Sequence, residues 1–429
     1  MEICVDKIEV SDNELRYRLR VPRALRKYFL SGTSYVKYDS AIDLRKSDQS
    51  ILALPIVSIV APIAWAVGAD VRVGELDSTY RESLAKIRDI FRGMYPQFSY
   101  SGSIHIEKVV VNTFGGSRAG LLFSGGVDSM TSYLRHKDEK PDLIVVRGIQ
   151  AAPFEAEFWD GLIADIRSVV ERDGITVLHL ETDILQNVNF ELLSRQFGVS
   201  WYGSFAENFC MLGVCAPLAT ARDIGSIYIA ATYSTGDFER PLAHPQVDNN
   251  LAWADVRVAH DGSDLSRQQK VGYIRRSGSL DYLSKISVCR ENLSGQNCGK
   301  CDKCMWTIMN IVVEGIDPND CNFNIDRNTF KRIKDSFLKG MIGMSSSRFY
   351  YWRDIQRNMP EKIDNDIFGS REFLEWFREF DLSQYKTNRI RRFLWHALLL
   401  YRNRRIKVPA VKRKVKCYYY IVLSRLGLA

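Results

Sequence analysis

Residues 124–129, Ser-Gly-Gly-Val-Asp-Ser, have the types and spacing of a phosphate-binding turn. They follow a short apolar run and precede a stretch with helical periodicity. Two consecutive glycines allow a turn in which several backbone N–H groups point into one concavity, and the start of the next helix adds a partial positive charge. The hydroxyls of Ser124 and Ser129 can donate to phosphate oxygens. The segment predicts an anion site, and the alternative is a Gly-Gly turn with an Asx-type helix cap.

Asp128 places a carboxylate in this turn, where it would repel a bare phosphate. We therefore expect Mg²⁺ between Asp128 and the phosphate oxygens. The P-loop of kinases and GTPases has a lysine after its glycines that neutralises the β- and γ-phosphates. No lysine follows Gly126 within this shorter turn, which disfavours transfer of a γ-phosphoryl group.

Four of the nine cysteines lie within 16 residues, in the spacing C-x8-C-x2-C-x2-C. Four thiolates on one short segment make a closed tetrahedral zinc site, and a closed site leaves no position for a catalytic water. We therefore expect structural Zn²⁺. Disulfides and reduced cysteines without metal are the alternatives, and the lack of a secretion signal disfavours the disulfides. The expected ligands are Cys289, Cys298, Cys301 and Cys304.

Short apolar runs alternate with helical stretches on both sides of the glycine turn. This alternation predicts a parallel, doubly wound, Rossmann-like sheet flanked by helices, that is, an α/β fold. Ligands of such sheets bind at the carboxyl ends of the strands, where the glycine turn lies. The apolar runs are 120–123, 143–146, 175–180 and 227–231, and the helical stretches are 127–136, 156–171 and 205–222.

Residues 1–117 predict a separate α/β domain that offers no catalytic constellation. Residues 77–94 have the periodicity of an amphipathic helix with Asp77 or Ser78 as its cap. Residues 51–69 carry no charge, but two prolines interrupt them. Because proline inside a helix costs about 3 kcal/mol, we predict a buried helix or strand there and no membrane span.

The net charge of +8 belongs to the end of the chain. Residues 386–429 hold thirteen of the 59 lysines and arginines and no acid, so 46 basic and 51 acidic residues remain elsewhere. This tail also carries aromatic residues, among them Trp395, Tyr401, Tyr418, Tyr419 and Tyr420. It predicts contact with a polyanion, nucleic acid or a protein partner, with a solvated helical face docked on the chain itself as the alternative. Residues 1–21 show no secretion signal, so we expect a cytoplasmic protein.

The glycine turn and the cysteine cluster, in this order and at this separation, resemble the 7-cyano-7-deazaguanine synthase family of PP-loop ATP pyrophosphatases. The cysteine spacing matches that family's zinc motif at each position. Asn208 matches an asparagine of the family's R-N pair, and Ser266-Arg267 fits the place of its T-K pair. The similarity covers residues 118–311. It implies a PP-loop domain with a zinc loop over residues 118–320. Family members lack the basic tail, and the pattern of this sequence itself predicts a helical, basic C-terminal region over residues 321–429.

The resemblance also implies an activity. The family adenylates a carboxylate on 7-deazaguanine with ATP, releases pyrophosphate, lets ammonia displace AMP to give an amide, and dehydrates the amide to a nitrile after a second activation. Arg267 would then approach the phosphates, and the backbone near Val146 and Gly148 would receive adenine. The residues that would hold pyrophosphate and Mg²⁺ are Ser124, Gly125, Gly126, Val127, Asp128 and Ser129.

The sequence departs from the family in the substrate loop and at Glu207, where the family has arginine. The family reads G-x-N-x-x-D and then Y-P-D-C-R after its fourth strand, whereas residues 230–237 and 244–248 read AATYSTGD and HPQVD. We therefore expect contacts with a different substrate, although His244 could equally cap backbone groups of its loop. The candidate substrate-binding residues are Asn208, Tyr233, Asp237, His244 and Asp248.

The sequence thus predicts an ATP-dependent carbon–nitrogen ligase that adenylates a carboxylate or carbonyl oxygen, releases pyrophosphate, and forms an amide or nitrile. The alternatives are a tRNA-modifying PP-loop enzyme (a thiolase or a lysidine-type ligase) and a nucleotide-binding subunit of a bacterial defence or polysaccharide-modifying system. The expected partners are a small carboxylate or modified purine, the tail's polyanion or protein, and a second copy of the chain.

Overall fold

The computed structural model describes residues 1–149, 156–235, 244–278, 280–289, 296–363 and 365–388. It divides the chain into two compact units. The first comprises residues 1–295 and 320–322, and the second comprises residues 296–319 and 323 onward.

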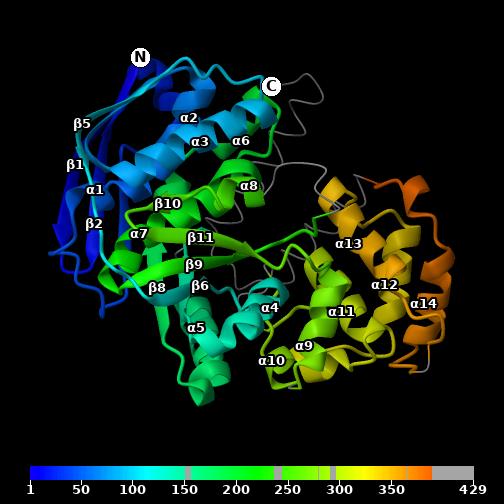
Figure 1. Ribbon diagram of the computed structural model, residues 1–429. Coiled ribbons are helices and arrows are strands. Elements are labelled where there is room, and N and C mark those ends of the chain that lie inside the picture. Colours follow the sequence, from blue (N-terminus) through cyan, green and yellow to red (C-terminus); the bar gives the residue numbers. More distant parts are fainter. Residues whose placement is uncertain (150–155, 236–243, 279, 290–295, 364, 389–429) are drawn as a thin grey trace. The chain divides into compact units, whose positions relative to one another are not determined.

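One sheet of eleven strands organises the first unit (Figure 1). Its order is β10-β11-β9-β6-β7-β8-β3-β2-β1-β4-β5. The strands are β1 (Glu2–Ser11), β2 (Glu14–Arg20), β3 (Thr33–Tyr38), β4 (Asp70–Asp77), β5 (Ile104–Val110), β6 (Arg118–Leu122), β7 (Asp142–Arg147), β8 (Val177–Thr182), β9 (Ile224–Ala230), β10 (Ala252–Trp253) and β11 (Val256–Asp261).

The five strands β11, β9, β6, β7 and β8 are parallel to one another, which confirms a mostly parallel α/β sheet. The chain builds this part outward from β6, first through β7 to β8 and then on the other side through β9 to β11. In open α/β sheets, ligands bind at the carboxyl ends of the strands where the direction of winding reverses, and here that reversal lies between β6 and β9. The glycine turn leaves β6 at this point.

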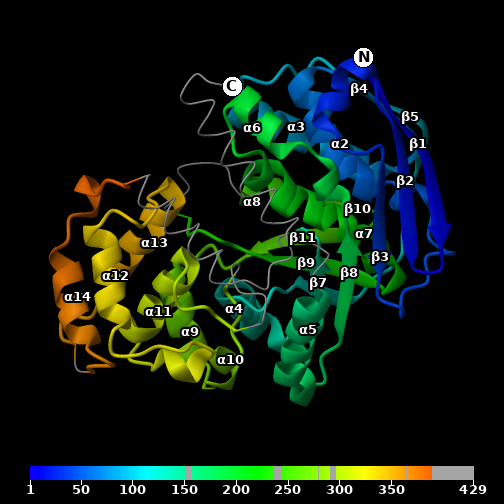
Figure 2. The ribbon, with the colours of Figure 1, turned by 180° about the vertical axis from the view of Figure 1, so that it is seen from behind.

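The N-terminal strands extend the same sheet. Strand β3 pairs antiparallel with β8, with Val36 opposite Thr182 and Tyr38 opposite Leu180, and Figure 2 shows the two strands side by side. The predicted boundary between residues 117 and 118 therefore falls inside the first unit. Local patterning cannot reveal such a pairing, because its partners are far apart in the sequence.

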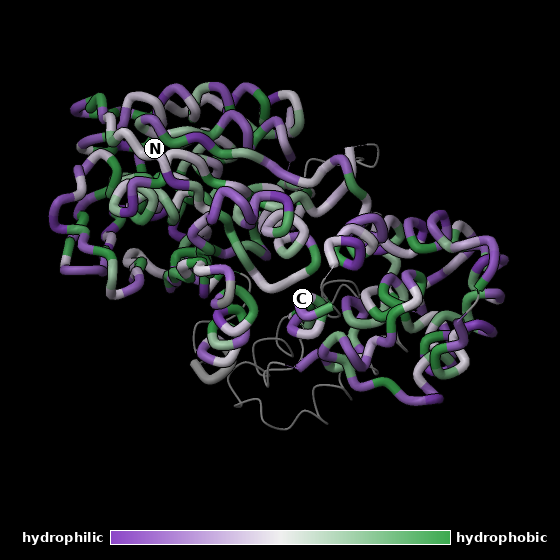
Figure 3. Tube along the Cα trace, turned by 60° about the horizontal axis from the view of Figure 1, so that its bottom comes forward, coloured by the Kyte–Doolittle hydropathy of each residue, from purple (hydrophilic) through white to green (hydrophobic). Residues whose placement is uncertain are grey.

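The uncharged segment 51–69 forms two helices, α1 (Gln49–Leu52) and α2 (Leu54–Val67), that are buried in the core of the first unit. Helix α2 packs closely on α7 (Met211–Ala221). A Cβ on Gly213 of α7 would lie 2.4 Å from Ser58 Oγ of α2, so the contact requires glycine there. In Figure 3 the colour of the tube changes repeatedly between hydrophilic and hydrophobic along the chain. Within the described residues, no helix is both long and apolar enough to cross a membrane.

Asp77 is the N-cap of α3 (Ser78–Met94), as one of the two predicted alternatives has it. The carboxylate is fully buried, and its Oδ1 accepts from the backbone N–H groups of Tyr80 and Ala254, both at 2.9 Å. Asp77 therefore joins β4, α3 and the turn after β10.

The helix predicted over residues 205–222 begins three residues earlier in the structure. It consists of a π-helical part, η5 (Tyr202–Cys210), followed by α7. The remaining helices of the first unit are α4 (Val127–His136), α5 (Ala156–Val170), α6 (Phe190–Phe197), α8 (Pro245–Asp248), α9 (Arg267–Arg276) and α10 (Asp281–Ser284). Short 3₁₀ helices are η1 (Arg23–Tyr28), η2 (Lys137–Glu139), η3 (Glu171–Asp173), η4 (Ile184–Asn187), η6 (Pro318–Cys321) and η7 (Leu382–Gln384).

The second unit is helical and aromatic over the residues that the structure describes, which include part of the helical region predicted from residue 321 onward. Phe337 lies at its centre, 4.8 Å from Trp352 and 5.3 Å from Phe377 between ring centroids. Its helices are α11 (Asp302–Val313), α12 (Thr329–Leu338), α13 (Ser346–Arg357) and α14 (Ser370–Glu379). The basic tail after residue 388 lies outside the described residues.

Candidate functional site

The glycine turn connects β6 to α4, as the sequence predicts. Gly125 has a φ of 70°, a left-handed conformation that favours glycine, and Gly126 caps α4. Ser129 Oγ accepts from the backbone N–H of Ser124 at 3.2 Å and donates to the carbonyl of Gly126 at 3.2 Å. The two serines are therefore held together across the turn. Val127 is fully buried, so only its backbone faces the turn.

Asp128 lies in the first turn of α4 and binds two cations. Arg267 Nη1 lies 2.5 Å from Asp128 Oδ2, and Lys270 Nζ lies 3.3 Å from Asp128 Oδ1. The side chain of Asp128 is 22% exposed, whereas those of Arg267 and Lys270 are 2% and 1% exposed. Two buried cations thus lie next to the glycine turn, and both contact its one partly exposed carboxylate, Asp128.

Both cations come from α9, whose start the sequence fixes. Ser266 and Gln269 form a capping box, in which each side chain accepts from the other residue's backbone N–H. Arg267 and Lys270 are three residues apart, so they share a face of the helix. Sequence reasoning predicted Arg267 and missed Lys270, although this spacing after a serine cap was a readable sign.

Lys270 also donates to the carbonyl oxygen of Ala231, at the end of β9, at 2.5 Å. Burial lowers the pKa of Lys270, and the nearby Asp128 carboxylate opposes that shift. Arg267 and Lys270 place two cations beside the turn, and the N-terminus of α4 adds a partial positive charge there. The arrangement can hold an anion.

This geometry bears on the Mg²⁺ predicted at Asp128. Each carboxylate oxygen already lies beside a cation, Arg267 or Lys270. Asp128 can therefore bind Mg²⁺ only if phosphate groups are bound as well, so that Arg267 and Lys270 pair with the phosphates and release the carboxylate.

A second cluster, at the carboxyl end of β11, consists of the predicted residues Asn208 and Asp248 and of His260, which was not predicted. Asp248 Oδ2 accepts from Asn208 Nδ2 at 2.7 Å and lies 2.7 Å from His260 Nδ1. Asp248 and His260 are 1% and 0% exposed. The sequence suggested Asn208 and Asp248 separately, but it gave no reason to single out His260.

His244 is the N-cap of α8, and its Nδ1 accepts from the backbone N–H of Gln246 at 3.1 Å. This is the capping role that the sequence left open for it. Burial lowers the pKa of His244; His260 acts in the same direction, and Asp248 acts against it.

Gly148 follows β7 and has a φ of 93°. A Cβ there would lie 1.8 Å from the carbonyl oxygen of Thr182, so the close approach of two backbones requires glycine. Val146 is a buried residue of β7. Contact of this backbone with adenine stays a prediction.

The remaining predicted substrate residues belong to the segment after β9. Tyr233 is partly buried there, and Asp237 lies outside the described residues. The backbone N–H and the hydroxyl of Thr235 both donate to the carbonyl of Ser263 at 2.7 Å, which joins the segments after β9 and β11.

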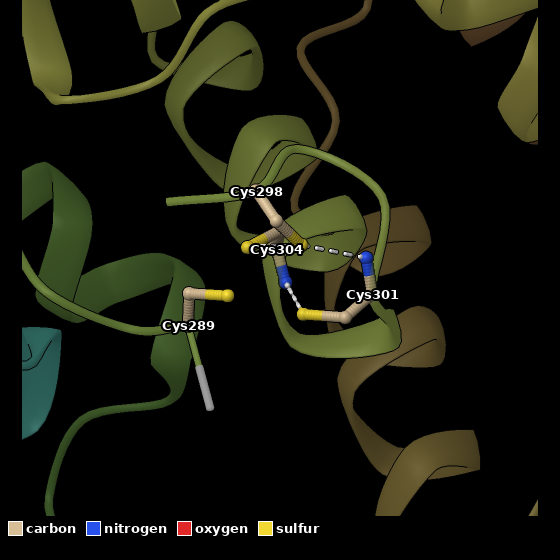
Figure 4. A group of neighbouring side chains, drawn as sticks. All are labelled: Cys289, Cys298, Cys301 and Cys304. Carbon is tan, nitrogen blue, oxygen red and sulfur yellow. Dashed lines mark hydrogen bonds between the residues drawn. The ribbon is translucent and has the colours of Figure 1, made fainter. Parts of the chain in front are cut away.

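The four predicted cysteines lie together (Figure 4), and their sulfur atoms are all within 4.8 Å of one another. The Sγ atoms of Cys298 and Cys304 are 3.8 Å apart. Zn–S bonds of about 2.3 Å at tetrahedral angles give an S–S distance of about 3.8 Å, so this pair fits zinc. The four cysteines could therefore hold a metal ion such as zinc.

Backbone N–H groups approach the sulfurs in the same loop. Cys298 Sγ accepts from Cys301 N at 3.2 Å, and Cys301 Sγ accepts from Cys304 N at 3.4 Å. Such donors stabilise thiolates, the form that binds a metal. None of the eight described cysteines is in a disulfide.

No family model, curated protein or solved structure matches the chain in comparisons with known proteins. The resemblance to PP-loop enzymes stays a prediction from the residues of the turn and the cysteine spacing.

Proposed function

We propose that the chain is an ATP-dependent ligase that activates a carboxylate as its adenylate and releases pyrophosphate. The observation that carries this proposal is the pair of buried cations, Arg267 and Lys270, at Asp128 on the glycine turn. A seat of backbone N–H groups and fixed cations suits the two distal phosphates of ATP.

The residues have distinct roles in this reaction. A carboxylate oxygen of the substrate attacks the α-phosphorus, and the bond to the bridging oxygen of pyrophosphate breaks. The turn and Ser129 orient the leaving phosphates, while Arg267 and Lys270 stabilise the charge that develops on them. Asp128 would hold Mg²⁺, which neutralises further phosphate charge when bound.

The second half of the proposed reaction forms a carbon–nitrogen bond. A nitrogen nucleophile attacks the carbonyl carbon of the acyl adenylate, and AMP leaves with the electrons of the broken C–O bond. The resemblance to 7-cyano-7-deazaguanine synthase supports ammonia or an amine as the nucleophile. The cysteine cluster fits structural zinc, because four thiolates leave no coordination position for water.

The test supplies the purified protein with Mg²⁺-ATP, ammonium chloride and a panel of carboxylates headed by the 7-carboxylate of 7-deazaguanine. We expect AMP and pyrophosphate in equal amounts with at least one acid. Asp128→Ala should lower their formation by about 100-fold or more, because it releases both cations from the turn.

Asp138→Ala is the matched control, because Asp138 is an exposed residue of η2, just beyond the same helix. It should leave the rate unchanged. ADP and orthophosphate as products, or an Asp128→Ala variant with the wild-type rate, would contradict the proposal.

A further inference from the structure

His260 and Asp248 form a buried hydrogen-bonded pair that the phosphate site does not use. The Nδ1 of His260 lies 2.7 Å from Asp248 Oδ2, and both side chains are at most 1% exposed. An ionised carboxylate only accepts, so the hydrogen lies on Nδ1. With that tautomer, Nε2 carries the lone pair.

The lone pair has no donor among the residues that the structure describes, and the same holds for Asp248 Oδ1. A buried acceptor without a donor is costly, by about 1–3 kcal/mol. Two such acceptors in one cluster point to a ligand that supplies N–H groups.

The cluster is connected to the phosphate site through the ends of two strands. His260 precedes Asp261, whose carbonyl accepts from Ala231 N at 2.7 Å. The carbonyl of Ala231 accepts in turn from Lys270, which reaches Asp128. His260, on β11, thus lies at the same carboxyl edge of the sheet as the glycine turn after β6, and the parallel strand β9 lies between the two.

Further hydrogen bonds hold Asp248 and His260 in place. Asn208 donates to the same Oδ2 that faces His260, and Asn249 Oδ1 accepts from the backbone N–H of His260 at 2.7 Å. The π-helical turn, α8 and β11 together hold the imidazole in one orientation.

We infer that His260 is the general base for the nitrogen nucleophile, with Asp248 as its positioning residue. This inference rests on the proposed ligase function. As the nitrogen attacks the carbonyl carbon of the adenylate, its proton passes to His260 Nε2, the C–N bond forms, and the C–O bond to AMP breaks. Asp248 stabilises the imidazolium that results.

The test compares two nucleophiles on His260→Gln, with Asp248→Asn as a second variant. Both ammonia and hydroxylamine lose a proton when their nitrogen is acylated. Hydroxylamine is less basic and a stronger nucleophile towards acyl adenylates, so it can pass that proton to water and needs no base on the protein. We expect amide formation from ammonium chloride to fall by about 100-fold or more, and hydroxamate formation to stay within about threefold of the wild type. His179→Gln is the matched control, because His179 Nδ1 lies 2.7 Å from Asp39 Oδ2 in a more exposed pair.

Equal losses with both nucleophiles would mean a structural role and would overturn the inference, as would no loss. A wild-type protein that forms no AMP would overturn the proposed function instead. If the variants do not fold, ring-labelled [¹⁵N]histidine spectra of the wild type, which has six histidines, decide. We expect the hydrogen of His260 on Nδ1 and a shift of Nε2 on addition of ammonium chloride; a protonated Nε2 would overturn the inference.

Discussion

Lys270 lies between Asp128 and Ala231, 3.3 Å from the carboxylate and 2.5 Å from the carbonyl oxygen. It thereby connects the start of α4 with the end of β9. A buried lysine costs free energy unless it is paired, and these contacts offset that cost. This position suits a lysine whose positive charge stabilises a bound anion.

Lys270→Met should separate activity from stability. Methionine fills a similar volume and removes the buried charge, and Arg267 still pairs with Asp128. The free energy of unfolding should therefore fall only by about 1–3 kcal/mol, because the buried carbonyl of Ala231 loses its donor. Formation of AMP should fall by about 100-fold or more, because one of two phosphate cations is lost. Denaturant unfolding and the pyrophosphate assay measure the two effects.

The control for this variant is Lys137→Met. Lys137 forms an ion pair with Asp173 at 2.8 Å, away from the glycine turn. It should leave AMP formation unchanged, and a loss as large as that of Lys270→Met would refute a specific role of Lys270.

Gly148→Ala should destabilise the first unit. The added Cβ would meet the carbonyl of Thr182 in a backbone conformation that favours glycine, and we expect a loss of about 3 kcal/mol or more. Gly174→Ala is the comparison, since its φ is 66° with open space around the Cβ, and it should cost about 1 kcal/mol. Equal melting temperatures for the two variants would show that the close approach to Thr182 is not maintained.

The purified protein should contain one zinc ion per chain by elemental analysis. Cys298→Ser should lose most of it and unfold at lower temperature, because metal-binding free energy is folding free energy. Cys4→Ser, a substitution on β1, should keep the full zinc content. A metal-free wild type that melts as high with a chelator as without one would contradict the zinc assignment.

Deletion of residues 389–429 should abolish binding to tRNA or heparin and leave AMP formation within about twofold of the full chain. The truncation point keeps Thr387 and Asn388, which bind the carbonyls of Ile342 and Gly340 at 3.0 and 2.7 Å. Binding by the full chain should weaken steeply between about 50 and 200 mM salt. Loss of AMP formation on truncation would make the tail part of the catalytic unit.

The features that were predictable from sequence are local. The glycine turn, the cysteine spacing and the cap at Asp77 each depend on residues within one short segment, and the structure has them as expected. Four of the five parallel strands could be read from apolar runs, with boundaries shifted by up to three residues, as in β9 (Ile224–Ala230). The fifth, β11 (Val256–Asp261), was not predicted.

The features that were missed depend on contacts between distant segments. The pairing of β3 with β8 merges the predicted N-terminal domain into one sheet. Lys270 is 142 positions from Asp128 in the sequence, and His260 is 12 positions from Asp248. Only the fold shows that each pair is in contact, although the position of Lys270 after a serine cap could have drawn attention to it. No periodicity reports such contacts.

The fate of the γ-phosphate of ATP tests the central claim most directly. With [γ-³²P]ATP, Mg²⁺ and an accepted carboxylate, in the absence of pyrophosphatase, the label should appear in pyrophosphate, and Asp128→Ala should stop its release. Label that appears in orthophosphate, with ADP as the other product, would contradict a turn that holds the two distal phosphates as a single leaving group.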